Sequence, residues 1–355
     1  MFDISNYETY KIVNVLAFII GSLFGIVAQK NQFCFSGAIK DYFLTSSTKR
    51  ASSVLLSMIS AVIFTQLFSF IYDINLMNSY YFEDNINYFS IIFGGSLFGM
   101  GMMIADGCAS RNLIKFAQGD IRALITLIFV AIFALATKKG ILSEVNELFV
   151  TNSILVNISS YLENYQINLY IMLLLLITLL FTTMKKLKYL FQLYDGIIIG
   201  FIISLAWLVT SFGKHESLEK IINLSSLSFV YPSAKTLEYF SFYEINELSF
   251  GVSSVFGVLV GAYFMSKKNK RYSFGCTSQN EKRNLKSNMF GGALMGTGGV
   301  LALGCTVGQG LSGLSTLAFS SLLAISSILI SGYFTAKYLN NKNELPNCFI
   351  FEWKD

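Results

Sequence analysis

The chain of 355 residues has few charged residues, two prolines and one histidine. Charged residues make up 13% of it and hydrophobic residues 54%, whereas about 25% of a soluble protein is charged. This composition excludes an ordinary soluble protein. The two prolines and 33 phenylalanines favour membrane helices over a β-barrel. The lone His215, expected in an outer loop, excludes a zinc site or a Ser/His/Asp catalytic set within the membrane.

Five cysteines are present, an odd number without a C-x-x-C pair, so we expect neither a disulfide framework nor a metal site. No GxxxxGK[ST] sequence occurs, so the chain itself is not expected to hydrolyse ATP, and we expect no cofactor. The polar start MFDISNYETY leads into an apolar run without a small-residue cleavage site, so the first span is expected to stay in the protein. Any role of the cysteines would be as thiols.

The apolar runs predict nine transmembrane helices in one transmembrane domain over residues 1–355. A span needs about 20 apolar residues to cross a hydrocarbon core of about 30 Å. The predicted spans are 11–29, 51–72, 89–105, 121–137, 169–184, 194–212, 245–266, 289–303 and 314–338. The spans 89–105 and 289–303 are short and glycine-rich, so we expect both to end inside the bilayer.

The basic residues predict the orientation, because lysine and arginine concentrate in cytoplasmic loops. With the N-terminus outside, 20 of the 26 basic residues lie inside, and the outer loops carry mainly acids. We therefore predict an outer N-terminus and a cytoplasmic C-terminus. The net charge of +5 reports this topology and needs no nucleic-acid partner.

Two glycine-rich segments of the chain are copies of one another. FGGSLFGMGMMIADGC (93–108) aligns without a gap with FGGALMGTGGVLALGC (290–305), and nine of the 16 positions are identical. The copies fall in the third and eighth predicted spans, an offset of five, so they cross the membrane in opposite directions. We predict an inverted repeat with halves of approximately 11–138 and 194–338 and a connector, 139–193. Short, Gly-interrupted spans at corresponding positions point to a transporter's binding site near the midplane.

Each copy ends in a glycine and a cysteine, Gly107-Cys108 and Gly304-Cys305, where the helix is expected to break. Irregular backbone at membrane depth must be buried in protein or line a polar cavity. The residues that follow, including Arg111 and Gln309, are mainly hydrogen-bond donors, which suit an anion at the start of a short helix.

A third cysteine, Cys34, ends the first span at another predicted break. A single cysteine in a membrane helix is more often a small packing residue than a functional thiol, but three cysteines at three breaks favour function. Cys276 and Cys348 lack this context, and we treat them as incidental. Glycines four residues apart in the first and sixth spans are interpreted as packing sites.

Asp106, next to Cys108 in the sequence, has two interpretations. An acid within the membrane is costly and often functional, which allows a proton site. Arg111 is close enough in sequence to pair with it, so a structural ion pair is an equally good interpretation.

Three stretches, QKNQFCFSGAIKD (29–41), GMGMMIADGCASRNL (99–113) and GGALMGTGGVLALGCTVGQGLSGLSTLA (291–318), resemble the YeeE/YedE family of sulfur-compound permeases. The resemblance covers nearly the whole chain. It implies an hourglass-shaped inner-membrane protein of two inverted halves, whose plunging loops place Cys34, Cys108 and Cys305 along a central path. It also implies passage of thiosulfate by S–H hydrogen bonds, without chemical conversion, toward a small TusA-type sulfur carrier on the cytoplasmic side.

We therefore expect an all-α polytopic permease of the inner membrane, with about nine transmembrane helices, short re-entrant helices and two inverted repeats. Its expected cargo is a small sulfur oxyanion, thiosulfate, with Arg111 and Gln309 compensating its charge. A membrane sulfurtransferase that takes sulfur covalently onto a cysteine is one alternative. A scaffold that passes sulfur or selenium species to a TusA-type carrier is another.

Overall fold

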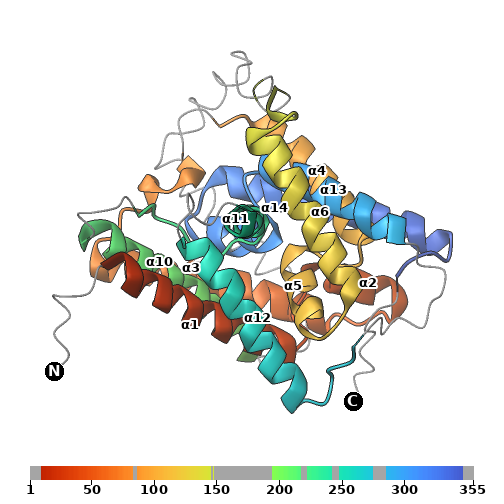
Figure 1. The fold of residues 1–355 in the computed structure, drawn as a ribbon, viewed down its shortest axis with the longest axis horizontal. Coiled ribbons are helices and arrows are strands. Elements are labelled where there is room, and N and C mark those ends of the chain that lie inside the picture. Colours follow the sequence, from red (N-terminus) through yellow and green to blue (C-terminus); the bar gives the residue numbers. More distant parts are fainter. Residues whose placement is uncertain are drawn as a thin grey trace.

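The computed structural model describes residues 9–82, 86–144, 147, 194–216, 222–241, 248–274 and 285–346, and these fold into helices joined by short connections (Figure 1). No β-strand occurs within these ranges. Seven stretches of the described chain are long and apolar enough to cross a membrane. The expected all-helical polytopic membrane class is therefore confirmed.

The long helices coincide with eight of the nine predicted spans. They are α1 (Thr9–Lys30), α3 (Lys49–Tyr72), α4 (Tyr88–Ile104), α6 (Ile121–Lys139), α10 (Tyr194–Glu216), α12 (Phe250–Lys268), α13 (Leu285–Leu301) and α14 (Phe319–Asn341). Both glycine-rich helices, α4 and α13, have 17 residues, which is about 26 Å at 1.5 Å per residue. They are short for a span, as expected. The ninth predicted span, 169–184, lies outside the described residues.

Short helices follow the breaks in the long ones. They are α2 (Phe35–Leu44), α5 (Ala109–Ala117), α11 (Val230–Ser241) and the π-helical η5 (Gly308–Gly313), and two 3₁₀ turns, η2 (Leu76–Asn78) and η3 (Tyr80–Phe82), connect α3 toward α4. The sequence predicted short helices after the breaks at Cys34, Cys108 and Cys305. It did not predict α11.

The long helices form two groups, and the short helices lie between them. In one group α1 packs against α12 and α10, and α10 packs against α3; in the other, α4 and α6 pack against α13, and α14 packs against α4. Each of α2, α5, α11 and η5 contacts a long helix of both groups. Figure 1 shows α11 end-on near the middle of the molecule. The short helices and the breaks before them therefore lie in the interior of the protein.

Glycines bring α4 and α13 into backbone contact. A Cβ added to Gly298 would lie 2.5 Å from the carbonyl oxygen of Gly94, and one added to Gly101 would lie 2.6 Å from that of Gly291. Because the early glycine of each helix meets the late glycine of the other, the helices run antiparallel. Gly94 and Gly291 are counterparts in the sequence repeat, as are Gly101 and Gly298.

The glycines interpreted as packing sites on other helices have that role. A Cβ on Gly21 of α1 would lie 2.2 Å from the carbonyl oxygen of Ser254 in α12, and one on Gly200 of α10 would lie 2.0 Å from Ser60 Oγ in α3. Any side chain at these positions would force the two helices of a pair apart.

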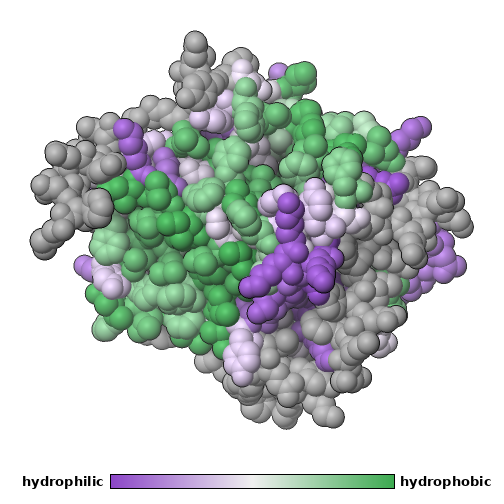
Figure 2. All heavy atoms as spheres, turned by 60° about the horizontal axis from the view of Figure 1, so that its bottom comes forward, coloured by the Kyte–Doolittle hydropathy of each residue, from purple (hydrophilic) through white to green (hydrophobic). Residues whose placement is uncertain are grey.

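Large apolar side chains cover the outside of the helices. Phe70, Phe264 and Phe334 are 89%, 65% and 64% exposed, although burial of such side chains would be strongly favourable in water. Figure 2 shows hydrophobic residues over much of the described surface, with hydrophilic residues in a central patch and in smaller groups toward the edges of the view. This surface is suited to contact with lipid chains.

Candidate functional site

Cys34, Cys108 and Cys305 are all buried and all free. Cys34 directly precedes α2 and Cys108 directly precedes α5, while Cys305 precedes the helical turn that leads into η5. The structure therefore places each thiol at the start of a short internal helix, as the sequence predicted. At this position the partial positive charge of the helix N-terminus favours an anion.

The thiols of Cys34 and Cys108 interact with each other across the two breaks. The Gly37 amide donates to Cys34 Sγ at 3.2 Å, and Ser36 Oγ lies 3.0 Å from the same sulfur. Cys108 Sγ lies 3.2 Å from Ser110 Oγ and also interacts with the hydroxyl of Thr306. Since Thr306 directly follows Cys305, it links the two copies of the repeat.

Cys305 accepts a hydrogen bond from the Gly308 amide at 3.3 Å, and its sulfur lies 4.0 Å from Ser228 Oγ. The hydroxyl of Thr306 is fully buried and has no partner within hydrogen-bond distance among the described residues, so its contact with the Cys108 thiol is a longer one. A row of weak donors, Ser228, Cys305, Thr306, Cys108 and Cys34, thus passes through the interior. Thiols and hydroxyls donate hydrogen bonds without carrying charge, so the row can hold an anion without binding it irreversibly.

Both breaks have the same backbone form. The residue before each glycine takes a left-handed conformation, with φ of 60° at Asp106 and 55° at Leu303, a region that costs an ordinary residue about 1–2 kcal/mol. The freed carbonyls are bound by amide side chains. Asn112 Nδ2 donates to the Gly107 carbonyl at 2.9 Å, and Gln309 Nε2 donates to the Ala302 carbonyl at 2.6 Å. One donor hydrogen of Gln309 is therefore engaged in holding the break, and the charge-compensating role expected of Gln309 stays a prediction.

Cationic side chains surround the inner pair of cysteines. Arg111 and Arg50 are cationic neighbours that act on Cys34, and the carboxylate of Asp41 lies near it as well. Arg111 donates to the Gln32 side chain, and Arg50 Nε lies 3.3 Å from Asp41 Oδ2. Arg50 is 5% exposed, and its Nη2 has no hydrogen-bond partner within the described ranges. Guanidinium groups in a buried setting bind oxyanions well.

Asp106 is held in an ion pair, with two partners that the sequence did not suggest. Lys40 and Lys115 both donate to its carboxylate, and all three side chains are at most 8% exposed. Arg111, the partner that the sequence suggested, also lies close enough to interact electrostatically with Asp106. Because two lysines hold the carboxylate, the structural interpretation of Asp106 accounts for its burial.

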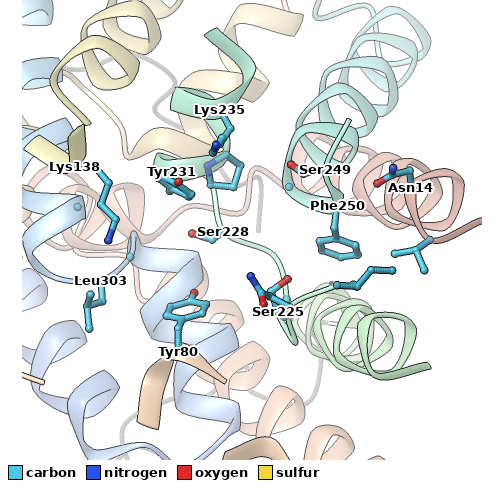
Figure 3. Close-up of a pocket in the computed structure, with 18 of the residues that line it drawn as sticks. Asn14, Tyr80, Lys138, Ser225, Ser228, Tyr231, Lys235, Ser249, Phe250 and Leu303 are labelled. Atoms are coloured by element: carbon cyan, nitrogen blue, oxygen red, sulfur yellow. The ribbon is translucent and has the colours of Figure 1, made fainter. Parts of the chain in front are cut away.

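A cavity of about 640 Å³ opens toward Cys305. Its lining includes Ser228 and Gly304, next to the thiol, and the cations Lys138 and Lys235, but no acidic residue from the part of the chain that the structure describes. In Figure 3, Lys138, Tyr231 and Tyr80 lie around Ser228. A cation-lined hollow raises the local concentration of small anions.

Glu238 on α11 keeps the cationic side chains near the cavity in place. Lys139 Nζ donates to Glu238 Oε1 at 2.9 Å, and Lys235 Nζ lies 3.1 Å from Oε2. The hydrogen bond from Lys139, and then that from Lys235, lowers the pKa of the Glu238 carboxyl. The carboxylate therefore remains charged and balances part of the charge of Lys139 and Lys235, while Lys138 also lines the cavity.

Sequence reasoning identified the three thiols, Gly107 and Gly304, but missed other residues of the site. Arg50, Ser228 and the cavity lysines come from segments far from any cysteine in the sequence. Only the similarity between CF (34–35) and SF (228–229), each before a short helix, signals one of them. Cys276 and Cys348 lie outside the described residues, as does the side chain of His215.

Comparison with known proteins agrees with this geometry. The family model described as sulphur transport matches residues 30–335. The thiosulfate transporter TsuA of Escherichia coli K12 is 24% identical over 345 residues, covering 90% of this chain and 93% of that protein. The TsuA of Spirochaeta thermophila is 31% identical over 35% of this chain and 36% of that protein. The probable transporter YedE of E. coli K12 is 28% identical over 30% of this chain and 25% of that protein. A family model that matches this much of the chain, with a buried row of thiols at helix breaks, shows that the protein belongs to the sulphur transport family.

Proposed function

We propose that the protein is a permease that takes up thiosulfate, without chemical conversion, along the row of Cys305, Cys108 and Cys34. The observation that carries the proposal is the placement of three buried free thiols at the starts of three short helices between the two helix groups. Thiosulfate pairs a soft terminal sulfur with a hard sulfonate end. A thiol is a weak donor and a polarisable acceptor, which suits that terminal sulfur.

Charge supports an anionic cargo at both ends of the row. The cavity near Cys305 is lined by lysines, and Arg50 and Arg111 act on Cys34 at the other end. The thiols of the row are buried, and a thiol donates a hydrogen bond without carrying a charge of its own. Cations at the ends of the row attract the anion, and the hydrogen-bond donors along the row bind it weakly enough for it to pass from one to the next.

The proposal includes a membrane-inverted repeat with the N-terminus outside. The antiparallel contact of α4 with α13 supports it, and so does the packing of the other helices. Exchange of the two halves turns the contact of α1 with α12 into that of α10 with α3, and the contact of α6 with α13 into that of α14 with α4. It also turns the contact of α2 with α3 into that of α11 with α12. In this orientation the lysine-lined cavity faces outward. Lys30, Lys267 and Arg271 then lie on the cytoplasmic side, where a TusA-type carrier is the proposed recipient.

Complementation tests the proposed function. In cells that lack their own sulfate and thiosulfate uptake, expression of this chain should restore growth on thiosulfate as the sulfur source. Cys108→Ala should abolish the growth, whereas Cys348→Ala, at a cysteine without a proposed role, should preserve it. No growth with the wild-type protein at normal membrane levels would contradict the cargo. A persulfide on one of the three cysteines during turnover would favour a sulfurtransferase instead.

A further inference from the structure

Ser228 lies two residues before the first residue of α11, close to the place that Cys34 occupies directly before α2. The helix α2 packs against α3 and α14, whereas α11 packs against α12 and α6, and these are the corresponding helices of the two halves. A phenylalanine follows both residues in the sequence, Phe35 after Cys34 and Phe229 after Ser228. The two short helices are therefore counterparts, and the residues before them correspond.

The contacts of the two residues correspond as well. Cys34 interacts with the thiol of Cys108, and Ser228 Oγ lies 4.0 Å from Sγ of Cys305, which is the repeat counterpart of Cys108. The hydroxyl has room because position 308 is a glycine, where an added Cβ would lie 2.8 Å from Ser228 Oγ. The pair Ser228–Cys305 thus repeats the pair Cys34–Cys108 with one sulfur replaced by oxygen.

Ser228 also lines the cavity, together with Lys138 and Lys235 (Figure 3). An anion that is drawn in by the lysines meets this hydroxyl, which lines the cavity as Gly304 does, before the fully buried Cys305. A hydroxyl is a harder and stronger donor than a thiol. It therefore suits a sulfonate oxygen, while the thiol of Cys305 suits the terminal sulfur.

We propose that Ser228 is a fourth binding residue of the path, in addition to the three cysteines. Its hydroxyl binds the sulfonate end of the anion in the outer cavity and positions the terminal sulfur toward Cys305. The proposal rests on the permease function above and adds a binding and positioning residue to it. It predicts that the cavity binds an anion with a hard, oxygen-bearing end and a soft sulfur at the other end. Ser228 then contributes to selection of thiosulfate over anions that lack the soft sulfur.

The presence of a hydroxyl at position 228, where the other half of the chain has the thiol of Cys34, has a chemical reason. Two thiols at a separation near 4 Å can approach and form a disulfide of about 2.05 Å, and disulfides persist in oxidising compartments outside the cytoplasm. In the proposed orientation the Ser228–Cys305 pair is the one exposed through the cavity. A serine there gives a hydrogen-bond donor that cannot be oxidised onto Cys305.

Uptake into proteoliposomes tests the role of the hydroxyl. Ser228→Ala should lower thiosulfate uptake about tenfold at low substrate concentration, the effect of about 1.4 kcal/mol, while Ser228→Cys in the presence of a reductant should restore part of it, because a thiol is the weaker donor. Ser233→Ala is the matched control, because Ser233 lies in the first turn of α11 and bonds only to the Phe229 carbonyl at 2.6 Å. It should leave uptake unchanged. The rescue by a thiol separates a donor role from a structural one.

Oxidation tests the geometry independently of transport. With a mild oxidant that accepts two electrons and two protons per disulfide, Ser228→Cys should cross-link to Cys305 and lose uptake, and a reductant should reverse both effects. Ser233→Cys should show neither. If Ser228→Ala takes up thiosulfate at the wild-type rate while Cys305→Ala is inactive, the binding role of Ser228 is contradicted, but the permease function still holds. If the wild-type protein does not carry thiosulfate, the permease function is contradicted. The cross-link would then still show that residues 228 and 305 are paired. Absence of the cross-link would contradict the pairing itself.

Discussion

Replacement of Cys305 by alanine removes the central donor of the proposed path with little change of volume. The sulfur is fully buried, accepts a hydrogen bond from the Gly308 amide and lies 4.0 Å from Ser228 Oγ. Alanine keeps the small side chain next to Gly304. It deletes both the S–H donor and the acceptor for the Gly308 amide.

The two losses differ in size and in what they affect. An unsatisfied buried amide costs about 1–3 kcal/mol of folding stability, which a protein of this size tolerates. A hydrogen bond to a charged group contributes about 1.5–3 kcal/mol, so an anion that passes position 305 without it should move about tenfold to 150-fold more slowly. Cys305→Ser should recover part of this rate only, because the hydroxyl is harder and binds backbone carbonyls nearby.

The assay is the initial rate of thiosulfate uptake per inserted protein, with thermal unfolding in detergent as the check on folding. We expect Cys305→Ala to unfold within a few degrees of the wild type and to take up thiosulfate at least tenfold more slowly. Cys276→Ala is the control, with wild-type uptake expected. A folded and inserted Cys305→Ala protein that transports at the wild-type rate would refute the thiol path, and the cysteines would then be packing residues.

Three further predictions concern the cavity, the buried ion pair and the topology. Lys138→Gln should reduce uptake several-fold at low thiosulfate through a raised KM, and high salt should shrink the difference because it screens the charge; an equal loss at saturating substrate would contradict this role. Asp106→Asn should destabilise the fold by about 3–5 kcal/mol, measured by thermal unfolding, because it leaves two buried lysines without a counter-charge; a normal melting temperature with altered pH dependence of uptake would favour a proton site instead. A periplasmic reporter fused after Tyr10 should be active and one fused after Lys270 inactive, and the reverse result would invert the topology.

The helices and the breaks could be predicted because their physical signals are local. Apolar length identifies a span, and the glycine-rich repeat identified α4 and α13 as a related pair. The identity of Gly94 with Gly291 and of Gly101 with Gly298 was visible in the sequence, and these glycines form the antiparallel contact. The cysteines at the ends of the spans were visible in the same way.

Partners that come from distant segments could not be predicted. Asp106 pairs with Lys40 and Lys115, because α2 and α5 bring both ammonium groups to it, whereas the sequence offered only the nearby Arg111. Arg50 reaches Cys34 from the start of α3. Such pairings depend on how the short helices pack between the two groups, which no local pattern records.

The effect on stability of replacing a packing glycine could not be predicted from the sequence either. From the sequence alone, Gly304→Leu, which places a bulky side chain beside the Cys305 thiol, is expected to reduce transport much more than Gly200→Ala at a packing site. The Cβ added at position 200 would lie 2.0 Å from Ser60 Oγ and 2.5 Å from the Ala61 amide nitrogen, so we expect Gly200→Ala to lower stability as well. At Gly304 the nearest atom to an added Cβ is Gln309 Cγ at 3.1 Å. The break is therefore less tightly packed than the helix contact.

Uptake of radiolabelled thiosulfate into liposomes that contain only this protein tests the central claim most directly. The account predicts time-dependent uptake of both sulfur atoms of thiosulfate in unchanged form, weak competition by sulfate, which lacks the terminal sulfur, and loss of uptake when Cys305, Cys108 or Cys34 is replaced by alanine. Uptake that is no faster than in empty liposomes, or that survives replacement of all three cysteines, would contradict it.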